Sequence, residues 1–418
     1  MSRTHRRRSR ATPSSRRRRR SVSSGAVLLA LAGCAALVIR WAPQDTPARA
    51  SAPGTADLPA TTTTAAKGGA SAAGGTAGLL PGMPAPLDPN DLYAADGPGM
   101  LAPILQNVTP RVWVPNSDGH SVSEIDPATF GVIRTFDVGR NPQHVVPSWD
   151  LRTLWVNNDK GNSLTPIDAL TGVVGAPVDV HDPYNLYFTP DGKSAVVMAS
   201  ADKQIVFRDP HTMAIQQALP VPCDGVNHAD FSPDGRYMIV SCEFTPMLLK
   251  VDIVNHAVLG TLPLPGGMPQ DVKIAPDGKT WYVADMNRNG LFVVDGDTFK
   301  TTGFIETGKG THGLYISRDS KTMYVTNRGE GTISLFDFAL EKVVGRWALP
   351  GGGSPDMGGL SVDGKQLWLT GRYNRVVYVI DTTTGKLLHK IPVGAGPHGL
   401  CFWPQPGRYS LGHTGILR

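Results

Sequence analysis

The feature of this sequence that most limits its fold is a segment of about 42 residues that occurs seven times in tandem. Each copy opens with a short apolar stretch, such as VWVPN or MYVTN, starting at Val112, Leu154, Ala195, Met238, Trp281, Met323 and Leu367. A second apolar stretch in each copy ends at Asp126, Asp168, Asp209, Asp252, Asp295, Asp337 and Asp381. Repeats of this length are single structural units that stack on their neighbours, so the period defines the architecture of the folded part.

The composition of each copy is that of four short β-strands joined by tight turns. After the second stretch come a third stretch, a Gly/Pro loop and a fourth stretch that ends in a turn such as FSPDGR, from Phe231. In four copies this turn has Gly after Asp, where a hairpin turn requires positive φ: Gly192, Gly235, Gly278 and Gly364. The stretches alternate or run apolar, which excludes the spacing of a helical repeat.

Seven copies of four strands predict an all-β fold. We expect a single seven-bladed β-propeller over residues 100–418, with four antiparallel strands in each blade. The first copy begins with the second strand of a blade, and the last ends with an innermost-type strand, HGLCFWP, from His398. The C-terminal strand is therefore predicted to complete the first blade and close the ring.

The sixth copy contains Tyr-Val-Thr-Asn within Met323 to Asn327. In this motif and its period the chain resembles the YVTN family of β-propeller repeat proteins, which includes YncE-like members. The family is distantly similar to surface-layer, cytochrome d1-type and lactonase propellers. The resemblance implies a seven-bladed ring outside the cytoplasm and does not supply a reaction.

Charge in this chain is concentrated at its start. The formal net charge is +5, but the first 20 residues contain ten arginines and no acid, so the remainder is mildly acidic. We therefore expect no nucleic-acid partner and interpret residues 1–20 as a basic cytoplasmic tail. Residues 21–41 are predicted to be a signal or anchor segment, because an apolar run behind positive charge directs the following chain across the membrane.

Three fates of this leader are open. It is long enough to anchor the chain in the membrane, Ala48-Arg49-Ala50 matches a signal-peptidase site, and Leu31-Ala32-Gly33-Cys34 resembles a lipidation motif. Residues 42–99 are rich in Ala, Thr, Gly and Pro, and we expect them to form a flexible linker. Each alternative leaves the propeller exported, either membrane-anchored or secreted.

Candidate binding residues fall in the loops that lead into the innermost strands, which meet at one mouth of the central channel. His144, His228 and Asp271 share one position of the repeat, and His312 and His398, with Asp356, occupy the position before it. Imidazoles and carboxylates are ligands of copper, zinc and iron, so the four histidines are candidate ligands of copper, another transition metal or haem. Neighbouring residues of a strand point opposite ways, however, so we expect the two sets of histidines to diverge.

Two further groups of residues are candidates for particular roles. Arg288, Arg328 and Arg372 lie in the loops of three consecutive blades and could bind a carboxylate or phosphate in bidentate fashion. Cys223 and Cys242 flank one innermost strand and are a candidate disulfide in an oxidising compartment.

The sequence contains no nucleophile and base motif that demands catalysis. The first hypothesis is accordingly a non-enzymatic binding or scaffold propeller outside the cytoplasm, with a protein or a small ligand as its unidentified partner. The alternatives are a metal- or haem-associated redox protein that uses the channel histidines, and a cation-dependent hydrolase of lactonase type that uses Asp271.

Overall fold

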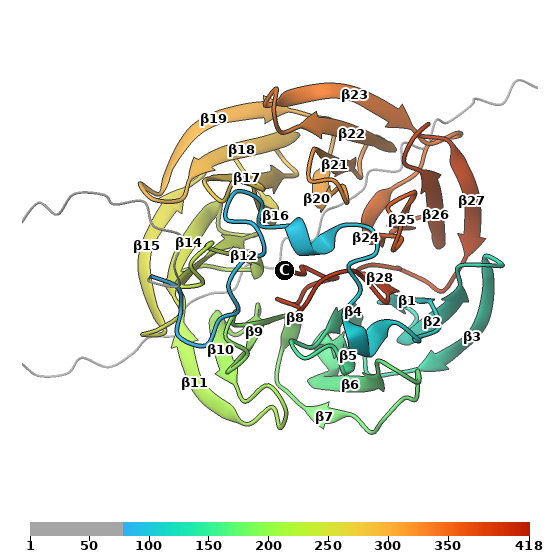
Figure 1. Ribbon diagram of the computed structural model, residues 1–418, viewed down its shortest axis with the longest axis horizontal. Coiled ribbons are helices and arrows are strands. Elements are labelled where there is room, and N and C mark those ends of the chain that lie inside the picture. The colour runs from blue at the N-terminus through green and yellow to red at the C-terminus, as the bar shows by residue number, and fades with distance from the viewer. Residues whose placement is uncertain (1–77) are drawn as a thin grey trace, which may run out of the picture. The chain divides into compact units, whose positions relative to one another are not determined.

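In the computed structural model, residues 78–418 are described, and these form a ring of seven four-stranded antiparallel sheets around a central channel (Figure 1). The sequence prediction of an all-β, seven-bladed propeller is confirmed. The basic tail, the leader with Cys34 and most of the linker lie outside the described residues. Among the described residues, no helix has the length and apolar character needed to cross a membrane.

Each blade contributes one strand to each of four concentric positions. The innermost strands are β28 (Cys401–Trp403), β4 (Pro142–Pro147), β8 (Pro183–Phe188), β12 (Val226–Phe231), β16 (Pro269–Ile274), β20 (Thr311–Ile316) and β24 (Pro355–Leu360). The second strands are β1 (Arg111–Asn116), β5 (Thr153–Asn158), β9 (Ala195–Ala199), β13 (Tyr237–Cys242), β17 (Thr280–Asp285), β21 (Thr322–Asn327) and β25 (Gln366–Gly371).

The two outer positions complete each sheet. The third strands are β2 (Ser121–Asp126), β6 (Ser163–Asp168), β10 (Gln204–Arg208), β14 (Met247–Asp252), β18 (Gly290–Asp295), β22 (Thr332–Asp337) and β26 (Val376–Asp381). The outermost strands are β3 (Gly131–Asp137), β7 (Val178–Asp179), β11 (Ile215–Pro220), β15 (Ala257–Pro263), β19 (Lys300–Glu306), β23 (Lys342–Ala348) and β27 (Leu387–Pro392). Three short 3-10 helices are also described: η1 (Ala94–Asp96), η2 (Pro103–Leu105) and η3 (Asp159–Gly161).

Ring closure follows the sequence prediction. The C-terminal strand β28 pairs antiparallel with β1, so the first blade has the order β28, β1, β2, β3 and joins both ends of the repeat array. The turn glycines also behave as expected, since Gly192, Gly235, Gly278 and Gly364 all have φ near +70°. The Asp at or just after each third strand caps its own hairpin, as Asp168 does by accepting the backbone N–H of Thr171.

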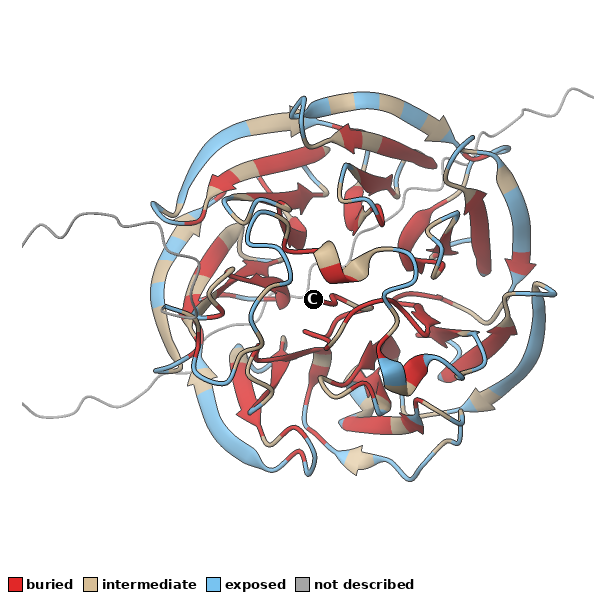
Figure 2. Cartoon of the chain, viewed as in Figure 1, coloured by how far each residue is buried: buried red, intermediate tan, exposed pale blue. Residues whose placement is uncertain are grey.

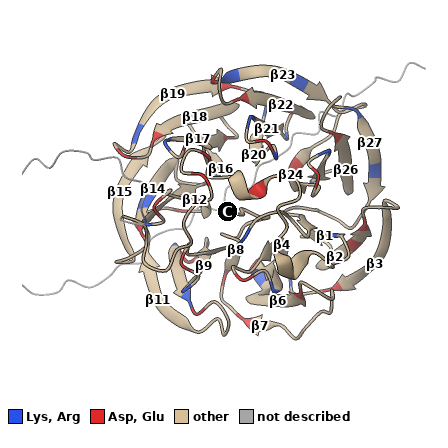
Figure 3. Ribbon diagram, viewed as in Figure 1, with Lys and Arg blue, Asp and Glu red and all other residues tan. Residues whose placement is uncertain are grey.

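Apolar side chains pack between neighbouring blades and stabilise the ring. In one cluster, Phe207 of β10 packs with Phe231 and Met238 of the next blade, and all three are almost fully buried. The inner three strands of each blade are largely buried, whereas the outermost strands are mainly exposed or half-buried (Figure 2). Charged residues lie mostly on the outer strands and in the loops (Figure 3).

One boundary of the predicted linker is wrong. Residues 78–99 were assigned to it, but Leu80, Leu92, Tyr93 and Ala95 are buried against the ring. Leu80 and Leu92 donate backbone hydrogen bonds to Asp234 and Pro276, in the tight turns that leave the innermost strands. The few apolar side chains of this segment are therefore enough to hold it against the ring, although its overall composition is rich in Pro and Gly. We call the side of the ring that carries these turns the turn face, and the opposite side the loop face.

Candidate functional site: a histidine cluster in the channel

The innermost strands begin with a β-bulge near the loop face. In β4, Pro142 pairs with Asn158 and Val145 pairs with Val156, so Gln143 and His144 together oppose a single residue. Strands β12, β16, β20 and β24 carry the same irregularity at the equivalent place. A bulge redirects side chains that strict alternation would send apart.

The bulges allow both sets of predicted histidines to reach one space. The ring centroid of His144 lies 5.7 Å from that of His228 and 5.0 Å from that of His398. His312 is 6.3 Å from His228 and 5.8 Å from His398 by the same measure. The expectation that the two sets diverge is therefore wrong, because it assumed regular strands.

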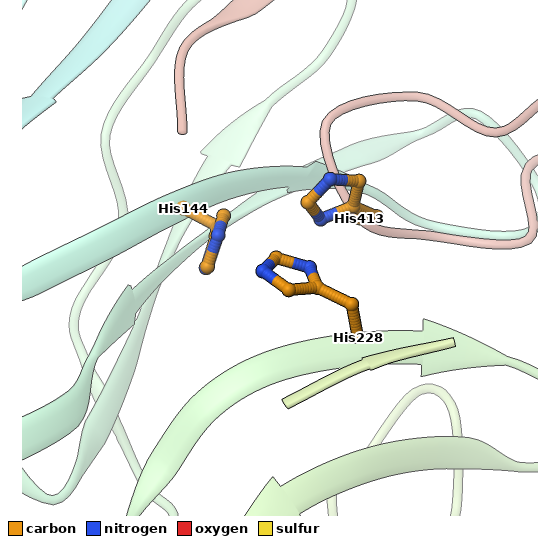
Figure 4. A group of neighbouring side chains, drawn as sticks. All are labelled: His144, His228 and His413. Carbon is orange, nitrogen blue, oxygen red and sulfur yellow. The ribbon is translucent and has the colours of Figure 1, made fainter. Parts of the chain in front are cut away.

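A fifth histidine, His413, completes the cluster and was missed by the sequence analysis. Its ring centroid is 4.8 Å from that of His228 and 5.2 Å from that of His144 (Figure 4). It lies beyond the last repeat, in a segment for which the period predicts nothing. Its position in the sequence could have identified it, because His413 follows the innermost strand β28 and the chain leaves such a strand beside the channel.

The segment that carries His413 is a buried hairpin in the channel. Ser410 and Leu417 pair with each other, and the segment also adds to the inner edge of β8. Phe188 donates its backbone N–H to Leu411 at 3.0 Å, and His413 donates its own to Leu186 at 2.9 Å. At the end of the hairpin, Arg418 donates to Asp230 at 2.9 Å, and both side chains are buried. We call residues 405–418 the channel hairpin.

Each of three histidines has one ring nitrogen engaged and the other without a partner. Nδ1 of His144 lies 3.0 Å from the carbonyl oxygen of Tyr184, so this nitrogen carries the proton and Nε2 keeps its lone pair. Nδ1 of His228 and Nδ1 of His413 lie 3.2 and 3.1 Å from the amide nitrogen of Asn185. Nε2 of all three is buried and has no hydrogen-bond partner among the described residues.

The other two histidines share a buried carboxylate. Asp356 lies 3.0 Å from Nδ1 of His312 and 2.8 Å from Nδ1 of His398, and it accepts a hydrogen bond from Arg328 at 3.1 Å. Burial alone would raise the pKa of Asp356, but the charge of Arg328, with the adjacent His312 and His398, holds it well below its usual range. A carboxylate behind an imidazole fixes its orientation, as it does for metal ligands.

All five histidines are neutral near pH 7. Burial lowers the pKa of His144, His228, His312 and His413 well below the usual value. For His398, burial and then the charge of Arg372 lower the pKa to about 4. Neutral imidazole is the form that binds a metal ion, and Nε2 of His144 already has a free lone pair. Nδ1 of His228 and His413 accepts from the Asn185 amide nitrogen, so these two rings carry their proton on Nε2 and must move it to Nδ1 before Nε2 can bind a metal.

The three remaining predicted site residues, Arg372, Arg288 and Asp271, lie in three different settings. Arg372 is half-buried and donates to Ser117 at 3.1 Å, and its charge acts on His398 from the loop face. Arg288 is exposed and its guanidinium lies over Phe292 and Phe304, so the structure does not bring it to the cluster. Asp271 is fully buried and accepts the N–H groups of Val272 and Leu314, each at 2.9 Å.

The two predicted disulfide cysteines are joined. Cys223 and Cys242 form a disulfide bond with an S–S distance of 2.10 Å. Cys242 pairs with Val226 at the start of β12, the strand that carries His228. The bond therefore ties the loop before β12 to β13. Cys401 is a free, buried thiol.

Solved structures with the same fold include proteins with different activities. Hydrazine synthase of Kuenenia stuttgartiensis matches with a TM-score of 0.58 and 20% identity, over 66% of this chain and 92% of that chain. A protein of Desulfotomaculum acetoxidans matches with a TM-score of 0.61 and 17% identity, over 70% of this chain and 98% of that one. Dihydro-heme d1 dehydrogenase NirN, in complex with DHE, matches with a TM-score of 0.54 and 19% identity, over 76% and 78% of the two chains. These likenesses show the fold alone.

Sequence comparison is more specific about the family. Protein YncE of Salmonella typhi is 32% identical over 134 residues, which is 31% of this chain. The matching part spans 37% of that relative's length, and YncE of Salmonella typhimurium matches to the same extent. The family described as YNCE-like beta-propeller matches residues 77–405, which include all seven repeats. The chain therefore belongs to the YNCE-like β-propeller family.

Proposed function

We propose that this chain is a non-enzymatic binding propeller, exported from the cytoplasm, that holds one transition-metal ion in its channel at His144, His228 and His413. The observation that carries the proposal is the convergence of their ring nitrogens, one from each residue, within 4.8 Å of one another. Their Nε2 atoms are buried without partners, and leaving buried polar atoms unpaired costs free energy unless a ligand satisfies them.

The spacing of the three rings is that of a metal site. A metal held by three imidazoles at about 2.1 Å in tetrahedral directions places the ring centroids about 5 Å apart. The three centroid separations are 4.8, 5.2 and 5.7 Å, so small side-chain movements would close the site. The ring of His398 lies 5.0 Å from that of His144, but His398 is not part of the group whose ring nitrogens converge.

The donor set favours a late first-row metal. Imidazole nitrogens bind copper, zinc, nickel and iron, and affinity rises along the series to Cu²⁺ and falls again at Zn²⁺. We therefore expect Cu²⁺ to bind most tightly and Zn²⁺ to bind next. A metal ion at three neutral imidazoles leaves the site positively charged, and the adjacent Asp271 carboxylate, 4.0 Å from Nε2 of His413, partly balances it.

Export rests on two features. A run of uncharged residues follows ten arginines, which is the order that directs the following chain across a membrane. The Cys223–Cys242 disulfide fits an oxidising compartment. Whether the leader is cleaved, lipidated at Cys34 or kept as an anchor, the propeller is proposed to lie outside the cytoplasm.

The same geometry makes the two other hypotheses weaker. A haem needs a flat slot, whereas the five imidazoles fill the space between them with centroids 4.8 to 6.3 Å apart and the channel hairpin lies beside them. The NirN likeness concerns the fold and does not supply such a slot. A lactonase-type cation site needs an open Asp271, but both oxygens of this buried carboxylate accept backbone hydrogen bonds.

The test is a copper titration of purified protein after treatment with a chelator. We expect one Cu²⁺ per chain, and His228→Gln should weaken binding by at least about 100-fold, since changes behind the ligands alone cost 10 to 100-fold. His211→Gln is the matched control, because His211 is exposed on the turn face and distant from the channel. No copper or zinc binding, or equal binding by His228→Gln and wild type, would refute the proposal.

A further inference from the structure

A separate cavity lies in the channel between the channel hairpin and the innermost strands of three blades. Its volume is about 40 Å³, and its walls include Lys273 of β16, Tyr315 of β20, Gly359 of β24 and Thr414 of the hairpin. Tyr93 and Asp96, from the segment that crosses the turn face, also line it. None of the five clustered histidines lines this cavity.

Lys273 is the feature of this cavity that demands an explanation. Its side chain is on an innermost strand and the residue is only 7% exposed. The residue pairs with Tyr282 in the β-ladder, but its side chain makes no hydrogen bond or ion pair among residues 78–418. Nζ of Lys273 keeps some accessible surface, but a residue this little exposed has few waters around its ammonium group, so the lysine favours an acceptor within the cavity that it lines.

The charges of the lining favour a negatively charged acceptor. Lys273 and Arg318 are cationic and Asp96 is the one carboxylate in the lining, so the lining carries an excess of positive charge. Asp96 lies 3.6 Å from Arg318, and burial raises the pKa of Asp96 to about 7, which leaves it partly protonated at neutral pH. Asp271, two residues before Lys273, is already occupied by two backbone N–H groups.

The size of the cavity limits the occupant. A cavity needs about 10 to 15 Å³ for each water, so about 40 Å³ accommodates three or four non-hydrogen atoms. Gly359 keeps the space open, since a Cβ added there would meet no atom nearer than 3.8 Å. Its φ is not in the left-handed region, so a larger residue fits the strand and would fill the cavity.

We propose that this cavity is a binding site for a small monovalent carboxylate, held by the ammonium group of Lys273 with Arg318 beside it. The site goes beyond the proposed metal centre and does not depend on it, because the two have no lining residue in common. Lys273 supplies the charge-assisted hydrogen bond that anchors the anion. Formate and acetate have three and four non-hydrogen atoms and match the volume.

The experiment measures binding of ¹³C-formate to the chelator-treated protein by NMR line broadening at constant ionic strength. We expect saturable binding at millimolar concentrations that Lys273→Met weakens by at least about tenfold, because it removes a hydrogen bond to a charged group. Gly359→Val should abolish binding by filling the space while it leaves both cations in place. Lys279→Met, an exposed lysine after the same strand, should bind as wild type does.

Several results would overturn the proposal. One is the absence of saturable formate binding by wild type, and another is unchanged binding in both Lys273→Met and Gly359→Val. If Lys273→Met alone fails to fold, as judged by circular dichroism, Gly359→Val decides the question. The metal titration is read separately on the same samples, so failure of one site does not imply failure of the other.

Discussion

Acidifying the metal-free protein from about pH 6.5 to about pH 5.5 should destabilise it, because five buried histidines remain neutral in the fold. Burial lowers the pKa of each below that of the unfolded chain, so only the unfolded state takes up these protons. Stability from such groups is complete above the unfolded pKa of about 6.5 and is lost as the pH falls below it.

The magnitude follows from the number of histidines and the groups that oppose them. Each buried neutral histidine lowers the free energy of unfolding by about 1 kcal/mol across this pH interval, and five lower it by about 5 kcal/mol. Carboxyls with raised pKa act in the opposite sense, since burial raises the pKa of Asp96 and Asp159 to about 7 and that of Asp271 to about 6. These carboxyls take up protons in the folded protein and so raise the free energy of unfolding by about 2 kcal/mol in total, after a reduction for the partial exposure of Asp159. The net loss of stability is then about 3 kcal/mol.

Guanidinium unfolding curves at the two pH values, with chelator present, give this difference directly. His228→Gln removes one of the five titrating groups, so the free energy of unfolding should fall by about 1 kcal/mol less on acidification than it does in wild type. His211→Gln should behave as wild type because His211 is exposed. A stability that is flat or rises on acidification would refute the assignment of five neutral, buried histidines.

Two further predictions concern residues behind the site. Arg418→Met leaves the buried Asp230 carboxylate without its cation and should lower the free energy of unfolding by about 3 kcal/mol, measured by denaturant unfolding; a change below about 1 kcal/mol would contradict a buried pair. Asn185→Asp places a carboxylate between Nδ1 of His228 and Nδ1 of His413 and should raise copper affinity by about 10-fold or more. Asn185→Leu removes both contacts and should lower copper affinity. Competition with a chelator measures both affinities. Equal affinities in the two variants would show that Asn185 does not orient these rings.

The fold was predictable because each repeat contains its own strands and turns. The repeat period, the Asp that caps each third strand and the glycines after the turn Asp can all be recognised in short stretches of sequence. The first repeat lacks an innermost strand of its own, and β28 supplies it by pairing with β1. The one wrong boundary, at residues 78–99, arose because a few apolar residues dispersed among Gly and Pro are buried only through long-range contacts.

The site was predictable only in part, because it depends on departures from the repeat. His144, His228, His312 and His398 were identified from their common positions, but the bulges that turn both sets inward have no clear sequence signal. His413 lies outside the period, and its place is set by pairing of the channel hairpin with β8. Arg288 matched Arg328 and Arg372 in sequence but contacts outer-strand aromatic rings instead.

The central claim is that His144, His228 and His413 hold one metal ion, and anomalous diffraction from crystals of the copper-loaded protein tests it most directly. The account predicts one strong peak at the copper edge, about 2 Å from a ring nitrogen of each of the three histidines. A channel without a peak, or copper bound only at exposed histidines such as His181 and His211, would contradict it.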